Sequence, residues 1–152
     1  MNDMTEQTRD FSEFYGYQFE ELKVGMTAAI GRTVTEADIV LFAGVSGDTN
    51  PAHLDEEMSA ASMFGGRIAH GMLSASYVSA VFATRLPGPG CIYLSQTLKF
   101  KAPVKAGDTV VARVTIKELN TAKRRAQFDT VCTVRGKVVL EGEAEILVPA
   151  RA

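Results

Sequence analysis

The stretch HGMLSASYVSAVFAT, residues 70–84, has almost no large polar side chain among its apolar ones. Ser74, Ser76 and Ser79 are embedded between leucine, valine and phenylalanine positions, so no face of a helix with this sequence is clearly solvated. The run Pro87-Gly88-Pro89-Gly90 follows and stops the pattern, because proline and glycine break helices. The sequence therefore predicts one long helix buried at the centre of the fold.

Downstream of this helix the apolar period changes from helical to alternating. Alternation is found in four segments, which are residues 92–100, 110–117, 126–134 and 138–148. Turn signals at residues 106–108, 120–121 and 135–137 separate the later segments. Helices followed by a run of strands indicate an α+β protein with an antiparallel sheet wrapped on the buried helix.

Upstream of the helix the signals are local and clear. Thr27 to Val34 favours a first strand, and Thr35-Glu36-Ala37-Asp38 resembles a capping box that begins a helix. Gly47 is suited to end that helix in a left-handed conformation, which leaves Asp48 on a loop just beyond it. Further upstream lies a cluster of aromatic residues too dense to be left in water, which we expect to pack as an arm across the body: Phe11, Phe14, Tyr15, Tyr17 and Phe19.

Composition limits the classes of function. The 152 residues, 46% hydrophobic and 22% charged, suit one globular domain, and a net charge of −2 gives no basic field for nucleic acid. Cys91 and Cys132 have no metal-ligand spacing and are expected to be reduced packing residues. The first ten residues lack a signal-peptide pattern, and no apolar run is long enough for a membrane, so we expect a cytoplasmic protein.

Both histidines of the chain lie in one short window. Asp48 and His53 are expected on an irregular segment held by Asn50-Pro51, where they can converge on one water molecule. Adding water to a double bond conjugated to a carbonyl needs a base, an acid and stabilisation of charge on the carbonyl oxygen. The backbone N–H of Gly71 at the start of the buried helix is the natural candidate for the third function.

Each of these residues also has a structural interpretation. An aspartate after a helix and an Asn-Pro loop are common without catalysis, and His70 is expected to hydrogen-bond the backbone near the helix start. Ser79 would ordinarily bond to a carbonyl one turn earlier. A nucleophilic mechanism has little support, since neither cysteine has a histidine nearby and no Gly-x-Ser-x-Gly elbow occurs. No phosphate-binding or dinucleotide fingerprint is present.

The motifs together resemble the MaoC-like (R)-specific enoyl-CoA hydratase family. The resemblance is carried by FAGVSGDTNPAH at 42–53, IAHGML at 68–73, LPGPGCIYLSQ at 86–96, FKAPV at 100–104 and Gly107-Asp108. It covers roughly Val24 to Val148. It implies a hot-dog fold, in which an antiparallel β-sheet wraps around a long central α-helix, with residues 1–21 as an N-terminal arm and 22–152 as the single domain.

By the same resemblance the reaction would be reversible syn addition of water to trans-2-enoyl-CoA, giving (R)-3-hydroxyacyl-CoA. Asp48 and His53 would be the catalytic pair, Asn50 would shape the turn, and Gly71 and Ser79 would bind the substrate. No metal or other cofactor is implied, since coenzyme A is part of the substrate. The resemblance also implies a homodimer with the acyl pocket near its interface, and no nucleic-acid or membrane partner.

Three alternatives remain open from the sequence. They are a 3-hydroxyacyl-carrier-protein dehydratase, a hot-dog acyl-CoA thioesterase and a noncatalytic acyl-thioester binding subunit. Acyl chain length and pathway, polyester precursor supply among them, are also open. Helical spacing favours core packing over pocket lining for Leu73, Tyr77, Phe82 and Leu86. The cations available for the coenzyme A phosphates are Lys99, Lys101, Lys105, Arg124 and Arg125.

Overall fold

The computed structural model describes residues 11–150. The expectation about a signal peptide concerns residues 1–10, which lie outside the described residues, as does the first half of the expected arm. The strands are β1 (Thr27–Thr33), β2 (Ile92–Gln96), β3 (Lys99–Phe100), β4 (Thr109–Asn120), β5 (Arg125–Val134) and β6 (Lys137–Leu147). The helices are α1 (Glu36–Ser46), α2 (Pro51–Leu54), α3 (Glu56–Ala60) and α4 (Gly71–Thr84), with 3-10 turns at Ser12–Phe14 and Phe19–Glu21.

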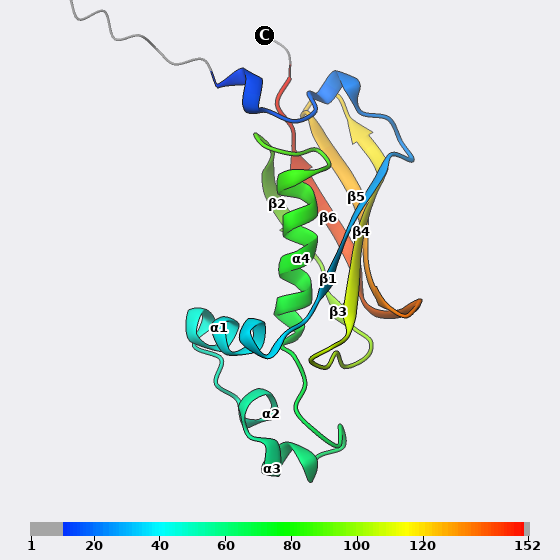
Figure 1. Ribbon diagram of the computed structural model, residues 1–152. Coiled ribbons are helices and arrows are strands. Elements are labelled where there is room, and N and C mark those ends of the chain that lie inside the picture. Colours follow the sequence, from blue (N-terminus) through cyan, green and yellow to red (C-terminus); the bar gives the residue numbers. More distant parts are fainter. Residues whose placement is uncertain (1–10, 151–152) are drawn as a thin grey trace, which may run out of the picture.

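One antiparallel sheet and one long helix form the body of the molecule. The strand order is β1-β4-β5-β6-β2, and β3 pairs with β6 beside this path. Helix α4 lies along the sheet, while α1, α2 and α3 gather at one end of α4 and the amino-terminal segment crosses the other end (Figure 1). This is the hot-dog arrangement, so the predicted α+β class and the central helix are confirmed. Across residues 11–150, none of the helices has the length and apolar character needed to cross a bilayer.

The alternating segments form strands because one of their two faces is buried against α4. In β4 the buried positions are Val110, Ala112, Val114 and Ile116, and in β5 all five even-numbered positions from Ala126 to Val134 are buried. The β5–β6 hairpin turns at Arg135 and Gly136, whose φ angles are +48° and +80°. Positive φ at both central residues is the signature of the two-residue turn that matches strand twist.

The segment 92–100 differs from the single strand that was predicted. It divides into β2 and β3, which pair with different parts of β6, and a register shift between Tyr93 and Ser95 lies within β2 itself. The chain then bends at Thr97, whose N–H donates to the Glu143 carbonyl at 2.8 Å. Ile92, Leu94 and Phe100 remain 40–54% exposed, so the alternation of this segment does not mark a face buried within one chain.

The prediction that α4 has no solvated face is wrong for the single chain. One side packs on the sheet and core through Leu73, Tyr77, Val78, Val81 and Phe82, which are at most 7% exposed. The other side carries Met72, Ser76, Ser79 and Ala83, all exposed at helical spacing. The reason is geometric, since the sheet curls around only part of the helix.

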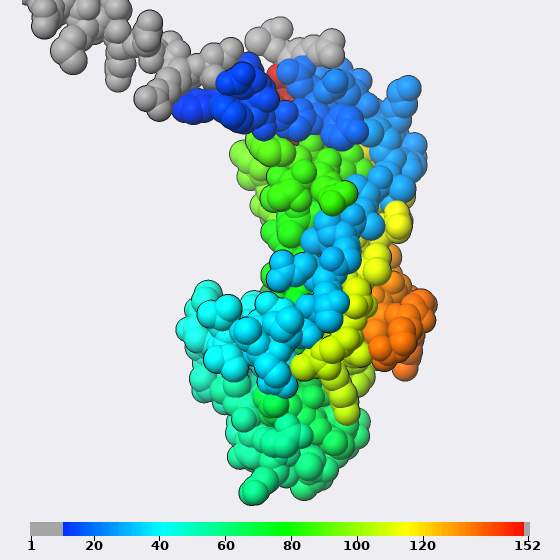
Figure 2. Space-filling model, in the orientation of Figure 1, coloured from blue at the N-terminus to red at the C-terminus, as the bar shows by residue number. Residues whose placement is uncertain are grey.

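The amino-terminal arm crosses the far end of α4, as expected (Figure 2). Its backbone donates from Gly16 to the Pro89 carbonyl at 2.9 Å and from Tyr17 to the Pro87 carbonyl at 2.8 Å. A Cβ at Gly16 would come within 2.2 Å of the Pro87 oxygen, so this close approach requires glycine. Of the five aromatic residues, only Phe19 is buried. Main-chain hydrogen bonds, rather than burial of the whole aromatic cluster, therefore hold the arm.

Candidate active site

Asp48 is positioned by the end of α1 and the start of α2. The capping box predicted at Thr35 and Asp38 begins α1, and Gly47 ends it with φ at +76°. The Asp48 carboxylate accepts from the Asn50 N–H at 3.2 Å, and the Asn50 side chain in turn accepts from the Ala52 N–H at 3.0 Å. This chain of short-range bonds holds Asp48 in place, with its side chain about half exposed at 51%.

His53 lies within the short helix α2 and not on an irregular segment as predicted. Pro51 occupies the first turn of α2, where its fixed φ favours a helix and its missing N–H is not needed. The side chain of His53 is buried, and its Nδ1–H donates to the Ile68 carbonyl at 2.7 Å. That bond leaves the Nε2 lone pair free, 3.8 Å from Oδ2 of Asp48.

The gap between His53 Nε2 and Asp48 Oδ2 suits one bridging water. At 3.8 Å the two atoms are too far apart for a good direct hydrogen bond. A water oxygen at about 2.8 Å from each of them fits between, because this is the usual length of such bonds. The pair can therefore hold and polarise one water molecule.

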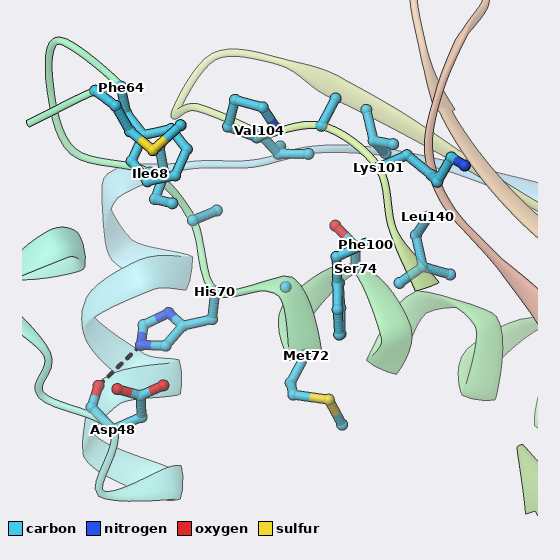
Figure 3. Close-up of a pocket in the computed structure, with 16 residues that line it drawn as sticks. Asp48, Phe64, Ile68, His70, Met72, Ser74, Phe100, Lys101, Val104 and Leu140 are labelled. Carbon is cyan, nitrogen blue, oxygen red and sulfur yellow. Dashed lines mark hydrogen bonds between the residues drawn. The ribbon is translucent and has the colours of Figure 1, made fainter. Parts of the chain in front are cut away.

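His70, the residue just before α4, is the third member of the cluster. Its Nε2–H donates to the backbone carbonyl of Asp48 at 2.9 Å (Figure 3). The prediction that His70 hydrogen-bonds the backbone is confirmed, and the acceptor lies 22 residues earlier in the chain. The ring also stacks on His53, with centroids 3.8 Å apart, and touches Phe42 of α1 at 4.9 Å.

The three side chains of Asp48, His53 and His70 bring candidate metal ligands within 4.8 Å of one another. Their arrangement does not fit a cation. The imidazole rings are stacked at an interplanar angle of 26°, so their in-plane lone pairs point along near-parallel planes and do not converge. One nitrogen of each ring is already bonded to a carbonyl. The expectation that no metal is needed stays a prediction.

A largely apolar cavity of about 530 Å³ opens beside this cluster (Figure 3). Asp48, His70 and Gly71 lie on its wall, and apolar residues such as Phe64, Ile68, Phe100, Val104 and Leu140 line the remainder. Gly71 is the first residue of α4, so its N–H is one of the donors that no carbonyl within the helix satisfies. The helix dipole makes this end favourable for negative charge.

Gly71 is also required by packing. A Cβ at this position would lie 2.6 Å from two ring carbons of Phe100. The ring of Phe100 therefore rests directly on the glycine at the start of α4. No local pattern predicts this contact, because Phe100 lies 29 residues further along the chain.

Arg67 links the segment that carries Ile68 to α1 and α3. Its guanidinium donates to both carboxylate oxygens of Glu36 at 2.9 Å and to Glu56 at 2.6 Å, which joins α1, α3 and the segment before α4. The hydrogen bond to Glu56, followed by that to Glu36, raises the pKa of Arg67. No sequence pattern indicates this cluster, since a lone arginine among distant glutamates has no recognisable spacing.

Two of the predicted binding residues stand apart from the cavity wall. Asn50 caps α2 through the bond to Ala52, which agrees with the predicted shaping of the turn. Ser79 lies on the exposed side of α4, two turns beyond Gly71, and is not part of the cavity lining. Leu73, Tyr77, Phe82 and Leu86 are buried core residues outside the lining, as predicted.

The cysteines are unsuited to nucleophilic chemistry. Both are free thiols, which confirms their expected reduced state. Burial raises the pKa of Cys132 to about 12 and also raises that of Cys91. A thiolate is the reactive form, so these environments suppress it.

Among the cations predicted for phosphate binding, Lys101 lines the cavity. Lys105 lies nearby, with its Nζ donating to the Phe64 carbonyl at 3.0 Å. Arg125 instead pairs with Glu145 at 2.9 Å, four residues along β6 from Glu141, the partner of Lys101. Lys101 and Lys105 therefore lie at or beside the cavity lining, whereas Arg125 is not part of it.

Comparison with known proteins gives consistent matches. The sequence model of the family described as MaoC like domain matches residues 20–141. The chain is 57% identical over 135 residues to an (R)-specific enoyl-CoA hydratase of Rhodospirillum rubrum, covering 89% of this chain and 94% of that protein.

Two solved structures share the fold. The unliganded R-hydratase of Pseudomonas aeruginosa superposes with a TM-score of 0.83 at 47% identity, covering 88% of this chain and 86% of that one. The (R)-hydratase of Aeromonas caviae involved in PHA biosynthesis gives a TM-score of 0.83 at 39% identity, covering 86% of this chain and 99% of the other.

Proposed function

The chain belongs to the MaoC-like domain family, and from this premise we propose that it is an (R)-specific enoyl-CoA hydratase. It is a hydro-lyase that adds water reversibly to trans-2-enoyl-CoA and gives (R)-3-hydroxyacyl-CoA. The observation that carries the proposal is the 3.8 Å separation of His53 Nε2 and Asp48 Oδ2, at a cavity whose wall includes Gly71.

The proposed reaction uses the lone pairs of the Asp48 carboxylate and of His53 Nε2. A water held between Asp48 and His53 bonds through its oxygen to C3 of the enoyl group, and the proton it loses passes to the pair. The pair returns a proton to C2, so Asp48 and His53 end the cycle as they began. The oxygen and the proton are both added from the side of the enoyl group on which the water lies, so the addition is syn. The bond from His53 Nδ1 to Ile68 supports this step, because it keeps Nε2 available as a proton acceptor.

Gly71 stabilises the charge that develops on the thioester oxygen. When oxygen adds to C3, electron density moves to the carbonyl, and an N–H at a helix start is placed to bind it. The absence of a side chain lets the thioester approach the backbone closely. The apolar cavity excludes water from this oxygen and strengthens the hydrogen bond.

The cavity and its cations suit an acyl-thioester substrate. Apolar walls favour the acyl chain or the pantetheine arm, and Lys101 and Lys105 are the cations positioned near the opening for phosphate. No metal or redox cofactor takes part in the proposed steps. The Aeromonas caviae relative is involved in PHA biosynthesis, which supports supply of (R)-3-hydroxyacyl-CoA for polyester synthesis as the use of the product.

We propose that the protein acts as a homodimer. The exposed side of α4, with Met72, Ser76, Ser79 and Ala83, and the edge strand β2, with Ile92 and Leu94, form a weakly polar surface. Such an edge and such a face require cover in a soluble protein. In a dimer built on this surface Ser79 becomes an interface residue, and its part in substrate binding stays a prediction.

The test is direct assay of the purified chain. Loss of enoyl-thioester absorbance with crotonyl-CoA and longer enoyl-CoAs, and chiral analysis that finds the (R)-hydroxy product, are expected. A thiol-reactive dye should detect no free coenzyme A, because its release would indicate the thioesterase. Faster turnover of the same enoyl group on carrier protein than on coenzyme A would indicate the carrier-protein dehydratase. Ligand-dependent thermal stabilisation without turnover would indicate a noncatalytic subunit, and the proposal would then fail.

A further inference from the structure

We propose that His70 is a positioning residue for the catalytic pair, fixing the backbone of Asp48 and the ring of His53 at the same time. The inference rests on the proposed function. The mechanism gives His70 no proton to transfer, yet this side chain touches both members of the pair, which come from different elements.

The contacts of His70 are specific on each side. Its Nε2–H donates to the Asp48 carbonyl at 2.9 Å, and its ring stacks on His53 with centroids 3.8 Å apart. The ring centroid of Phe42 in α1 lies 4.9 Å from that of His70. His70 is only 2% exposed. A shift of this ring would therefore displace Asp48 or His53.

The stack restrains the one motion of His53 that its own hydrogen bond leaves free. The bond from Nδ1 to the Ile68 carbonyl fixes the direction of the ring edge but allows tilt about that bond. The ring of His70, stacked at a centroid distance of 3.8 Å and an interplanar angle of 26°, resists the tilt. The two restraints together keep Nε2 directed at the Asp48 carboxylate, which is the geometry that one bridging water needs.

The two imidazoles are held in opposite tautomers. His53 carries its proton on Nδ1, facing Ile68, and His70 carries its proton on Nε2, facing Asp48. The Nδ1 of His70 is buried without a hydrogen-bond partner among the described residues. A proton there would be a buried donor with no acceptor, so the site selects the Nε2–H form and makes His70 a donor to Asp48.

A spectrum tests this geometry without substrate. The chain has only two histidines, so a long-range ¹H–¹⁵N correlation spectrum of the full chain shows two rings, and His70→Gln removes one of them. We expect an Nδ1–H ring for His53 and an Nε2–H ring for His70. An Nδ1–H ring at His70, or rapid exchange between tautomers there, would overturn the proposal. Absence of hydratase activity in the wild type would contradict the proposed function instead. The tautomers of the two histidines could still be assigned from the spectrum.

Three variants separate the contacts of His70. His70→Gln places an amide N–H at the Nε2 position without a ring, His70→Phe keeps a ring without the donor, and His70→Leu has neither. Misplacement of a catalytic group by about 1 Å can lower the rate about a hundredfold. We expect kcat to fall by that order in His70→Leu and by smaller factors in the other two, while KM changes less than about threefold.

The control for these variants is a buried substitution away from the site, Val114→Ala in β4. It should lower the melting temperature without a comparable fall in kcat. If His70→Phe and His70→Leu keep wild-type kcat, or if kcat merely follows the melting temperature across all four variants, His70 is a core residue and the proposal is wrong.

Discussion

Oδ2 of Asp48, in the loop between α1 and α2, lies 3.8 Å from Nε2 of His53 in α2, and no direct hydrogen bond joins them. The distance follows from three fixed points, which are the αL glycine that ends α1, the proline that begins α2 and the Ile68 carbonyl that receives Nδ1. A direct ion pair would leave no place for water. The separation is therefore the feature on which the proposed hydration depends.

Removing either member of the pair should abolish most of the turnover. General acid–base groups contribute about a hundred- to ten-thousand-fold, so Asp48→Asn and His53→Ala should each lower kcat by that order. The double variant should lose little more than the worse single one, because the two residues act as a unit. Hydration of crotonyl-CoA gives the rates, and melting curves show whether the fold is kept. Wild-type rates in both single variants would contradict the assignment.

Gly71→Ala should impair catalysis through a clash with Phe100. The new Cβ would lie 2.6 Å from the ring, so either the ring or the start of α4 must move. We expect kcat to fall about a hundredfold, as for displacement of a catalytic group. In a Phe100→Ala background the same substitution should have a clearly smaller effect on kcat. Equal losses in both backgrounds would show that the ring is not the cause.

Loss of the Arg67 cluster should loosen the site more than the whole fold. The glutamates are mostly exposed, so Arg67→Ala should lower the melting temperature of the whole fold only slightly. Hydrogen exchange should quicken in residues 56–68, and kcat should fall because Ile68 no longer holds His53 firmly. Arg67→Lys is the matched control for charge, since it keeps the cation but not the forked geometry. Unchanged exchange in residues 56–68 would contradict this prediction.

A charge on the exposed side of α4 should separate the proposed dimer. A stable interface buries about 800 Å² on each partner, and an arginine in place of Ala83 would fall within the proposed contact surface. Light scattering is expected to give twice the chain mass for the wild type and the chain mass for Ala83→Arg. Thr121→Arg, in the exposed β4–β5 hairpin, should remain dimeric. A monomeric wild type would contradict the dimer.

Stability should fall in acid through Asp108. The Lys105 N–H first, and then Arg135, hold the pKa of this carboxyl below its ordinary 3.8. A carboxyl whose pKa is lower in the folded state stabilises the fold above its unfolded pKa and loses that effect as the pH falls through the folded pKa. Asp108→Asn should therefore be less stable than wild type in urea at about pH 7, with the difference shrinking as the pH falls below the ordinary pKa of the carboxyl. Arg135→Gln should keep most of this pH dependence, because the backbone bond is the larger cause.

Much of the fold was predictable because its signals are local. The capping box at Thr35, the left-handed Gly47 and the alternation of β4 and β5 depend on neighbours a few residues away. The proximity of Asp48 to His53 was predicted for the same reason, since five residues and a proline limit their separation. The placement of His53 on a loop was wrong, because Pro51 begins a helical turn there.

The rest depended on residues that are distant in sequence. The division of residues 92–100 arises at Thr97, which bonds to Glu143 of β6 between the pairings of β2 and β3, and the exposed side of α4 arises because the sheet covers only part of it. The sequence alone determined the elements, the family resemblance and the candidate pair. Only the tertiary structure decided that Ile68 orients His53, that His70 holds Asp48 and that Phe100 covers Gly71. The physical reason is that carbonyl acceptors and ring contacts carry no residue pattern, and form only when the folded backbone brings separate segments together.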